Sequence, residues 1–329
     1  MCAMPERPRV FATAPLRGEG LERIRGFADV VYEPWIEQTP LRMLNAEQLA
    51  ERLTTEGATV VIVEADECKG PVLDLPLRAI ASTRGDPTNV DIETATAKGI
   101  PVLRAPGRNA DAVAEMTVAL LFAVNRGIIP ADRDVRAGAI YRDGTIPYQR
   151  FRAWQLAGRR AGLVGLGAVG RATKWRLVGL GMEVLSYDPY SPDATHTDLD
   201  DMLGEVDVVS MHAVVTPETA GMMGAPQFDR MRDGAIYLNT ARAGLHDTDA
   251  LVKVLESGKL AGAGLDHFEG EFLAADHPLV AMGNVALTPH IGGATYDTET
   301  THTRLIADGL EAILAGRRPD NLANPEVWT

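Results

Sequence analysis

The chain has 329 residues, 46% of them hydrophobic, and its 45 acidic and 32 basic side chains give a formal net charge of -13. This length allows two domains with separate cores, and the negative charge argues against binding to nucleic acid or to an anionic membrane surface. No apolar run reaches the roughly 20 residues of a membrane span, and the two cysteines lack metal-ligand spacing, so we expect a cytoplasmic protein without a membrane span, disulfides or a metal site.

The first hundred residues predict a small α/β unit. Short apolar segments at 9–15, 59–65 and 77–83 are typical of strands. Between the first two of them, 45–57 predicts a helix that begins at an asparagine N-cap and ends before a glycine. Strands and helices that alternate in this way form a sheet covered by helices.

A long helix is predicted over 110–125, where apolar residues recur around nearly the whole circumference. Such a helix must be buried, either between domains or between subunits. The stretch 137–158 is rich in turn-forming residues and predicts a long loop.

From about residue 160, apolar strands alternate strictly with helical segments. Six strands in this order predict a parallel, doubly wound sheet with helices on both faces. A last helix over 294–316 is expected to return to the first unit, which makes that unit discontinuous in sequence. The predicted strands are AGLVGLG, MEVLSYD, VDVVSMH, AIYLNTA, AGAGLD and NVALTPH.

Three glycines, Gly165, Gly167 and Gly170, have the spacing G-x-G-x-x-G between the first of these strands and a helix. This motif needs a tight turn at its first glycine, close approach of the backbone to a pyrophosphate at its second, and close helix packing at its third. The helix would begin near Ala168 and Val169, where free N–H groups favour an anion. The loop therefore predicts a dinucleotide site.

Asp188 stands at the end of the second strand of this domain. A carboxylate at that place accepts hydrogen bonds from the ribose hydroxyls of the adenosine and repels a 2′-phosphate. The sequence therefore favours NAD over NADP as the cofactor.

Four ionisable residues, Arg242, Asp266, Glu271 and His290, follow the fourth, fifth and sixth strands. The carboxyl ends of parallel strands meet at one edge of a sheet, so these side chains are expected to converge there. A guanidinium binds a carboxylate through two parallel hydrogen bonds, and an imidazole paired with a carboxylate exchanges protons near neutral pH. Reduction of a 2-keto acid needs such groups, because a hydride goes to the carbonyl carbon and a proton to its oxygen.

With the segments 89–102 and 107–117, these motifs make the chain similar to the D-isomer-specific 2-hydroxyacid dehydrogenases. The resemblance implies an NAD-binding Rossmann domain at 106–293 and a smaller, flavodoxin-like α/β substrate domain made of 1–105 and 294–329. It also implies an active site in the cleft between the domains and a homodimer built around the predicted long helix.

The resemblance assigns a role to each ionisable residue. Arg242 would bind the substrate carboxylate, and Asp266 would hold the nicotinamide carboxamide. Glu271 would orient and charge His290, the acid–base catalyst, which would contact both substrate and cofactor. The other cofactor contacts expected are Thr216, Thr240 and Ala241.

Four positions depart from the usual pattern of the family. Ala243 replaces a glycine and His246 an aliphatic residue, while His267 replaces a valine and Phe272 a proline. Because every charged group of the pattern is present, we expect these changes to reshape the pocket and to preserve activity.

Arg84 and Gly85 occupy a loop where the family commonly presents a Gly-x-Gly segment to the substrate carboxylate. Both are candidate substrate contacts. Arg84 is either a solvated loop charge or an additional anion-binding group in the pocket.

The expected function is an NAD-dependent oxidoreductase that interconverts a small 2-keto acid and its D-2-hydroxy acid. Formate dehydrogenases share the fold, but their chemistry releases no substrate proton and pairs the histidine with glutamine, whereas Glu271 is a carboxylate. The alternative to an enzyme is an NAD(H)-sensing binding protein that resembles the C-terminal-binding corepressors.

Overall fold

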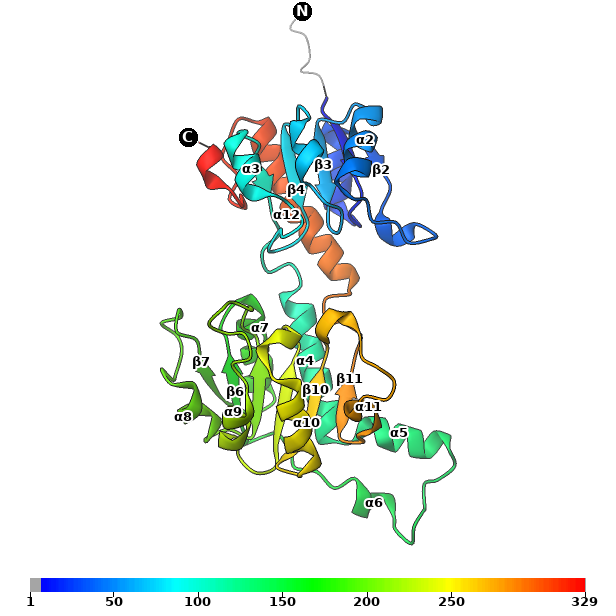
Figure 1. Ribbon diagram of the computed structural model, residues 1–329, viewed down its shortest axis with the longest axis vertical. Helices are drawn as coiled ribbons and strands as arrows, with labels where there is room; N and C mark the ends of the chain where they lie inside the picture. Colours follow the sequence, from blue (N-terminus) through cyan, green and yellow to red (C-terminus); the bar gives the residue numbers. More distant parts are fainter. Residues whose placement is uncertain (1–6, 329) are drawn as a thin grey trace, which may run out of the picture. The chain divides into compact units, whose positions relative to one another are not determined.

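The computed structural model describes residues 7–328, which form two compact units (Figure 1). Unit 1 consists of residues 7–108 and 295–328, and unit 2 of residues 109–294. The sequence predicted domain boundaries after residues 105 and 293. In the structure they lie after residues 108 and 294.

Unit 1 is built on a parallel sheet of five strands in the order β2-β1-β3-β4-β5. Helices cover the sheet, and the last of them, α12, comes from the C-terminal part of the chain and packs beside α1 (Figure 1). The strands are β1 (Arg9–Ala12), β2 (Asp29–Tyr32), β3 (Val60–Val63), β4 (Ala79–Ser82) and β5 (Val102–Leu103). The helices are α1 (Glu19–Phe27), α2 (Ala46–Glu56), α3 (Ile92–Ala97) and α12 (Tyr296–Leu314), with 3₁₀ turns η1 (Trp35–Glu37), η2 (Gly70–Asp74) and η5 (Pro325–Val327).

The three strands and two helices predicted for this unit are present. The predicted N-cap of α2 forms a capping box, in which Asn45 and Gln48 each accept from the other's backbone N–H, and Gly57 ends the helix with a φ of 62°. Strands β2 and β5 and helices α1 and α3 were not predicted from the sequence. The two strands are short, and α1 begins after Gly18 without a side-chain cap, so neither leaves a clear local signal.

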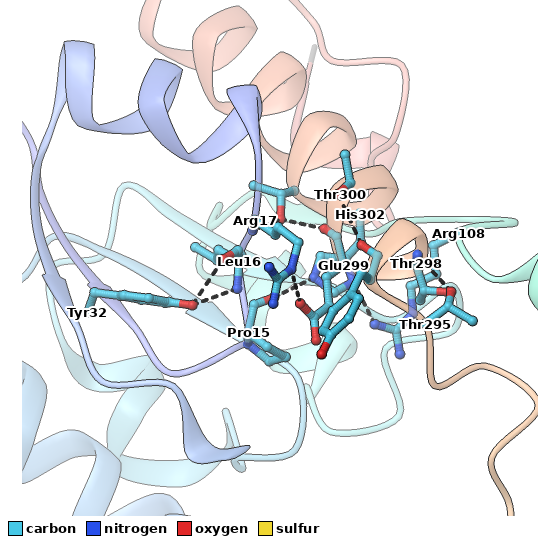
Figure 2. A network of polar contacts seen from close by, with 12 residues as sticks. Pro15, Leu16, Arg17, Tyr32, Arg108, Thr295, Thr298, Glu299, Thr300 and His302 are labelled. Carbon is cyan, nitrogen blue, oxygen red and sulfur yellow. Dashed lines mark hydrogen bonds and ion pairs between the residues drawn. The ribbon is translucent and has the colours of Figure 1, made fainter. Parts of the chain in front are cut away.

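A buried polar network joins the two ends of unit 1 that lead into unit 2 (Figure 2). His302 on α12 is 1% exposed, and its ring contacts the Pro15 carbonyl oxygen at 2.6 Å and Arg108 Nη1 at 2.8 Å. Arg108 also pairs with Glu64, and Thr295 caps α12 through its hydroxyl. Burial, helped by the Arg108 charge, lowers the pKa of His302 to about 4. The neutral ring can therefore accept from the guanidinium and donate to the carbonyl.

Unit 2 contains a parallel sheet of six strands in the order β11-β10-β9-β8-β6-β7. The strands are β6 (Arg160–Val164), β7 (Glu183–Tyr187), β8 (Val208–Met211), β9 (Ala235–Asn239), β10 (Leu260–Leu265) and β11 (Val285–Leu287). The helices are α4 (Ala110–Asn125), α5 (Ile128–Arg136), α6 (Pro147–Arg150), α7 (Ala168–Gly179), α8 (Leu199–Leu203), α9 (Ala225–Arg230), α10 (Thr248–Glu256) and α11 (Pro278–Ala281), with 3₁₀ turns η3 (Ala243–Leu245) and η4 (Glu269–Glu271).

All six strands predicted for unit 2 are confirmed, and so is the doubly wound arrangement. Strands β8 and β9 are buried along their whole length, because helices cover both faces of the sheet. The first strand, β6, lies between β7 and β8, so the order of strands reverses there. Ligands of such sheets bind at this switch point, beyond the carboxyl ends of the strands.

Helix α4 has the predicted bounds and packs against other elements of unit 2. It belongs to unit 2, where it contacts α7, β9, β10 and β11. Two glycines of β10 permit this approach, since a Cβ at Gly264 would lie 2.9 Å from Leu120 Cβ and one at Gly262 would lie 2.6 Å from Val124 Cγ1. One face of the apolar helix is therefore buried against the sheet of its own unit.

The segment 126–158, which follows α4, carries an unusual number of exposed apolar side chains. It contains α5 and the short α6, and it extends away from the sheet of unit 2 (Figure 1). Its exposed apolar residues are Ile128, Ile129, Val135, Ile140, Tyr141, Ile146, Tyr148 and Trp154. Within residues 7–328 no single helix is long and apolar enough to cross a membrane. Helices α4 and α5 together have the required length and composition, but the pair is bent by 63°.

Candidate functional site

The carboxyl ends of the unit 2 strands bring the predicted cofactor loop and the predicted reactive residues to one edge. The glycine loop follows β6 and Asp188 follows β7. Arg242 stands three residues after β9, and His290 three residues after β11. Because neighbouring strands pair in parallel, their carboxyl ends lie side by side along one edge of the sheet.

Two of the three loop glycines are required by contacts within the protein. Gly165 has a φ of 101°, and a Cβ there would lie 2.8 Å from the backbone nitrogen of Ala213. A Cβ at Gly170 would lie 2.1 Å from the carbonyl oxygen of Gly165, so α7 could not pack against the end of β6. Around Gly167, in contrast, no atom other than those of the glycine and its chain neighbours lies within 4 Å of the position of a Cβ.

The open space at Gly167 fits a bound dinucleotide. Gly167 is the N-cap of α7 and caps that helix without a side chain, so the N–H groups of its first turn, which contains Ala168 and Val169, have no side-chain partner there. A helix N-terminus of this kind attracts phosphate, and a glycine lets the pyrophosphate approach the backbone.

The Asp188 carboxylate is held against this loop. Its Oδ2 accepts from the backbone N–H of Leu166 at 2.7 Å, and its Oδ1 accepts from that of Tyr190 at 2.9 Å. The half-exposed carboxylate thus stands one residue beyond β7, next to the glycine loop, where the sequence analysis expected a group for the ribose.

His290 and Glu271, which the sequence predicts to act together, are in contact. Nδ1 of His290 lies 2.7 Å from Oε1 of Glu271, and the two side chains are 44% and 58% exposed. Both residues have left-handed backbone conformations, with φ of 54° and 55°. Such values are unfavourable for residues other than glycine and persist only where surrounding contacts impose them, as they do at many functional sites.

Asp266 imposes the conformation of the His290 turn. This carboxylate is 1% exposed and accepts from Thr288 Oγ1 at 2.6 Å and from the N–H groups of Ile291 at 3.0 Å and Gly292 at 2.8 Å. A Cβ at Gly292 would lie 2.8 Å from Oδ2, which explains the glycine. From the sequence, Asp266 was expected to hold the nicotinamide, and this structural role was not predicted, although all three donors lie within two residues of His290.

Arg242 is exposed in a turn that Asn239 closes. Asn239 donates to the Arg242 carbonyl at 2.8 Å and accepts from Ala241 N–H at 3.0 Å, and its amide also contacts His246 Nδ1 at 2.9 Å. The unusual His246 is therefore a buried support of the turn, and burial lowers its pKa to about 4. Asn239 was not identified from the sequence, although it begins the segment that carries the arginine.

The other predicted cofactor residues differ in exposure. The Thr240 hydroxyl is buried and lies 2.8 Å from that of Thr117 on α4, so this side chain ties β9 to the helix. Thr216 and Ala241 are half-exposed after β8 and β9. The backbone N–H of Thr216 donates to the hydroxyl of Thr219 at 2.8 Å.

The two predicted substrate residues of the first domain, Arg84 and Gly85, lie in unit 1 just after β4. Both are half-exposed, and the Arg84 carbonyl accepts from Ala105 N–H at 2.8 Å. Their contact with substrate stays a prediction.

Known proteins resemble this chain in sequence and in structure. Residues 118–292 match the family model described as D-isomer specific 2-hydroxyacid dehydrogenase, NAD binding domain. A glyoxylate reductase of Thermofilum pendens is 36% identical over 98% of this chain and 96% of its own length. The crystal structure of a putative D-isomer specific 2-hydroxyacid dehydrogenase from Polaromonas sp. JS6 66 has a TM-score of 0.84 with 30% identity, over 96% of this chain and 99% of that one.

A further solved structure bears on the cofactor. It is an NADPH-dependent glyoxylate/hydroxypyruvate reductase from Sinorhizobium meliloti in complex with NADP and malonate. Its TM-score is 0.75 with 25% identity, over 98% of each chain.

The glycine loop yields a matched pair of variants. Gly167→Ala should lower the free energy of unfolding by at most about 1 kcal/mol, because the added Cβ would lie in open space. The same Cβ should weaken NADH binding about tenfold or more, because it would occupy the space of the pyrophosphate. Gly170→Ala should lower the free energy of unfolding by about 1–3 kcal/mol, because its Cβ overlaps the backbone. Thermal unfolding and fluorescence titration with NADH measure both effects. Unchanged NADH affinity in Gly167→Ala would show that the loop does not meet the cofactor.

Proposed function

The chain belongs to the D-isomer-specific 2-hydroxyacid dehydrogenases, and from this premise we propose that it reduces a small 2-keto acid such as glyoxylate with NADH. Members of this family interconvert 2-keto and 2-hydroxy acids with a nicotinamide cofactor. One observation carries the assignment of residues. The strained His290–Glu271 pair is fixed at the same sheet edge as Arg242 and the glycine loop.

The chemistry follows from what each group can do. When bound, the reduced nicotinamide supplies the hydride to the carbonyl carbon. Arg242 would grip the substrate carboxylate through its guanidinium, and His290 would donate a proton from Nε2 to the carbonyl oxygen. Glu271 accepts the hydrogen of Nδ1, so it fixes the orientation of the ring and leaves Nε2 to face the substrate. In the oxidation direction the same ring takes the proton back.

The proposal of a small substrate rests on the relatives. Glyoxylate reductases of Thermofilum pendens and Thermococcus litoralis match 98% of this chain at 36% identity. The alternatives have less support. Glu271 argues against formate chemistry, as noted, and an NAD(H)-sensing protein has no need for an aligned proton donor.

The catalytic roles predict distinct kinetic effects. His290→Asn should lower kcat for reduction about 10²–10⁴-fold and leave NADH affinity nearly unchanged. Glu271→Gln keeps the shape of the side chain but removes its charge, so it should lower kcat at neutral pH about tenfold. Steady-state kinetics from pH 5 to pH 9 with glyoxylate measure both variants.

The exposed Glu269 supplies a control, since Glu269→Gln removes the same charge two residues from Glu271. The Glu269→Gln variant should retain the kcat of the parent. If His290→Asn keeps reduction within a few-fold of the parent, His290 is not the proton donor.

The proposed cofactor preference depends on Asp188. The parent should prefer NADH over NADPH by about tenfold or more in kcat/KM, because a 2′-phosphate beside a carboxylate is repelled. Asp188→Asn should narrow this ratio by improving the use of NADPH, whereas Asp193→Asn, at an exposed position nearby, should not. Equal use of the two cofactors by the parent contradicts the proposal.

We also propose a homodimer, with the exposed apolar segment 126–158 as the main contact rather than α4 itself. Apolar patches of this kind mark protein interfaces, and a C2 dimer uses the same patch on both subunits. The double variant Tyr141→Glu/Tyr148→Glu should give a monomer, while Tyr190→Glu, which alters an exposed tyrosine outside the segment, should not. Light scattering after size-exclusion chromatography measures the mass, and a monomeric parent refutes the proposal.

A further inference from the structure

His267 is a buried ring that the proposed chemistry leaves without a role. It follows Asp266 directly at the end of β10 and is 5% exposed. A buried imidazole costs free energy unless its nitrogens have polar partners. Its two nitrogens face the reactive residues, with Nε2 3.4 Å from Arg242 Nη1 and Nδ1 3.9 Å from Glu271 Oε1.

The face of this ring contacts His290. The two ring centroids are 3.7 Å apart and the planes are inclined by 49°. Because the His290 side chain is 44% exposed, burial alone does not fix its direction. Glu271 holds one nitrogen of the ring, and His267 lies against the ring itself, so the two contacts together define the orientation.

The surroundings favour a neutral His267. Burial, together with the charges of His290 and Arg242, lowers its pKa to about 4, against the opposing influence of Glu271 and Asp266. Near neutral pH the ring can therefore accept from the guanidinium at Nε2 and carry its proton on Nδ1, toward the Glu271 carboxylate. A neutral ring also packs against a protonated His290 without charge repulsion.

A metal ion is the competing explanation for this cluster. His267, Glu271 and His290 each offer one ligand atom, and these atoms lie within 4.8 Å of one another. Two imidazoles and a carboxylate are a common zinc set. However, a metal on His267 Nδ1 would place the proton on Nε2, facing the donor Nη1 of Arg242, and the guanidinium would repel the cation. The geometry therefore points to a link between charged groups and away from a metal site.

We propose that His267 is a positioning residue that couples Arg242 to the Glu271–His290 pair. Its Nε2 steadies the guanidinium, and its ring face steadies the imidazole. The inference rests on the proposed function, because it presumes that Arg242 binds the substrate carboxylate and that His290 donates the proton. A ring that holds both would fix the separation of carboxylate anchor and proton donor, which a 2-keto acid requires because its carboxylate and carbonyl are adjacent.

Two substitutions separate the two contacts. His267→Phe keeps a ring against His290 but removes the acceptor, so it should raise KM for the keto acid about three- to tenfold with kcat nearly unchanged. His267→Gln keeps an acceptor within reach of Arg242 but removes the ring, so it should lower kcat about three- to tenfold with KM nearly unchanged. NADH affinity and the unfolding temperature serve as controls for both variants. If the two variants change kcat and KM in the same proportion, or change neither, His267 only fills space and the inference is wrong.

A second measurement uses the parent protein and does not depend on the folding of variants. Nitrogen-15 NMR of the histidine side chains should show His267 neutral between pH 5.5 and 8, with its proton on Nδ1. A proton on Nε2, or a charged ring in this range, overturns the inference even if the enzyme is active. Loss of activity with a chelator, followed by recovery with zinc, also overturns the inference. Failure of the proposed function is distinct, since it would appear as a parent that reduces no 2-keto acid or as an active His290→Asn variant.

Discussion

The candidate site depends on the buried carboxylate of Asp266. A charge that is 1% exposed must have its lone pairs satisfied, and Asp266 satisfies them with a hydroxyl and two backbone N–H groups from the turn after β11. The turn is therefore drawn onto the end of β10. His290 lies within it, and its left-handed backbone is a consequence of this closure. Asp266 thus holds the backbone of the turn that carries His290, the proposed proton donor.

At the carboxyl edge of the unit 2 sheet, several charged side chains lie close together. Arg242, Glu271 and His290 are exposed, so water screens their charges, whereas the buried His246, His267 and Asp266 provide the fixed framework. Burial, aided by the charges of His290 and Arg242, lowers the pKa of His267 to about 4, and burial behind the arginine turn lowers that of His246 to about 4. The unusual histidines of this chain thus support the charged groups and do not compete with them for protons.

The glycines of unit 2 serve two different needs, which the structure separates. Gly165, Gly170, Gly262 and Gly264 are glycines because protein atoms occupy the space of a Cβ. The space of a Cβ at Gly167 is open, so no packing contact requires a glycine there and the space is available to the dinucleotide that the motif predicts. A sequence motif alone cannot make this distinction, because all of these residues look alike in it.

The sequence by itself determined the arrangement of unit 2 and most of its reactive set. Apolar runs of strand length and helices of clear periodicity are local signals, and parallel strands carry whatever follows them to a common edge, so Arg242, Glu271 and His290 could be predicted to converge. Only the tertiary structure decided what lies between them. The contacts of His267, the hold of Asp266 on its turn and the burial of α4 within unit 2 join segments that are distant along the chain. Such contacts depend on how side chains pack in three dimensions, and the spacing of residues in a sequence leaves no trace of that packing.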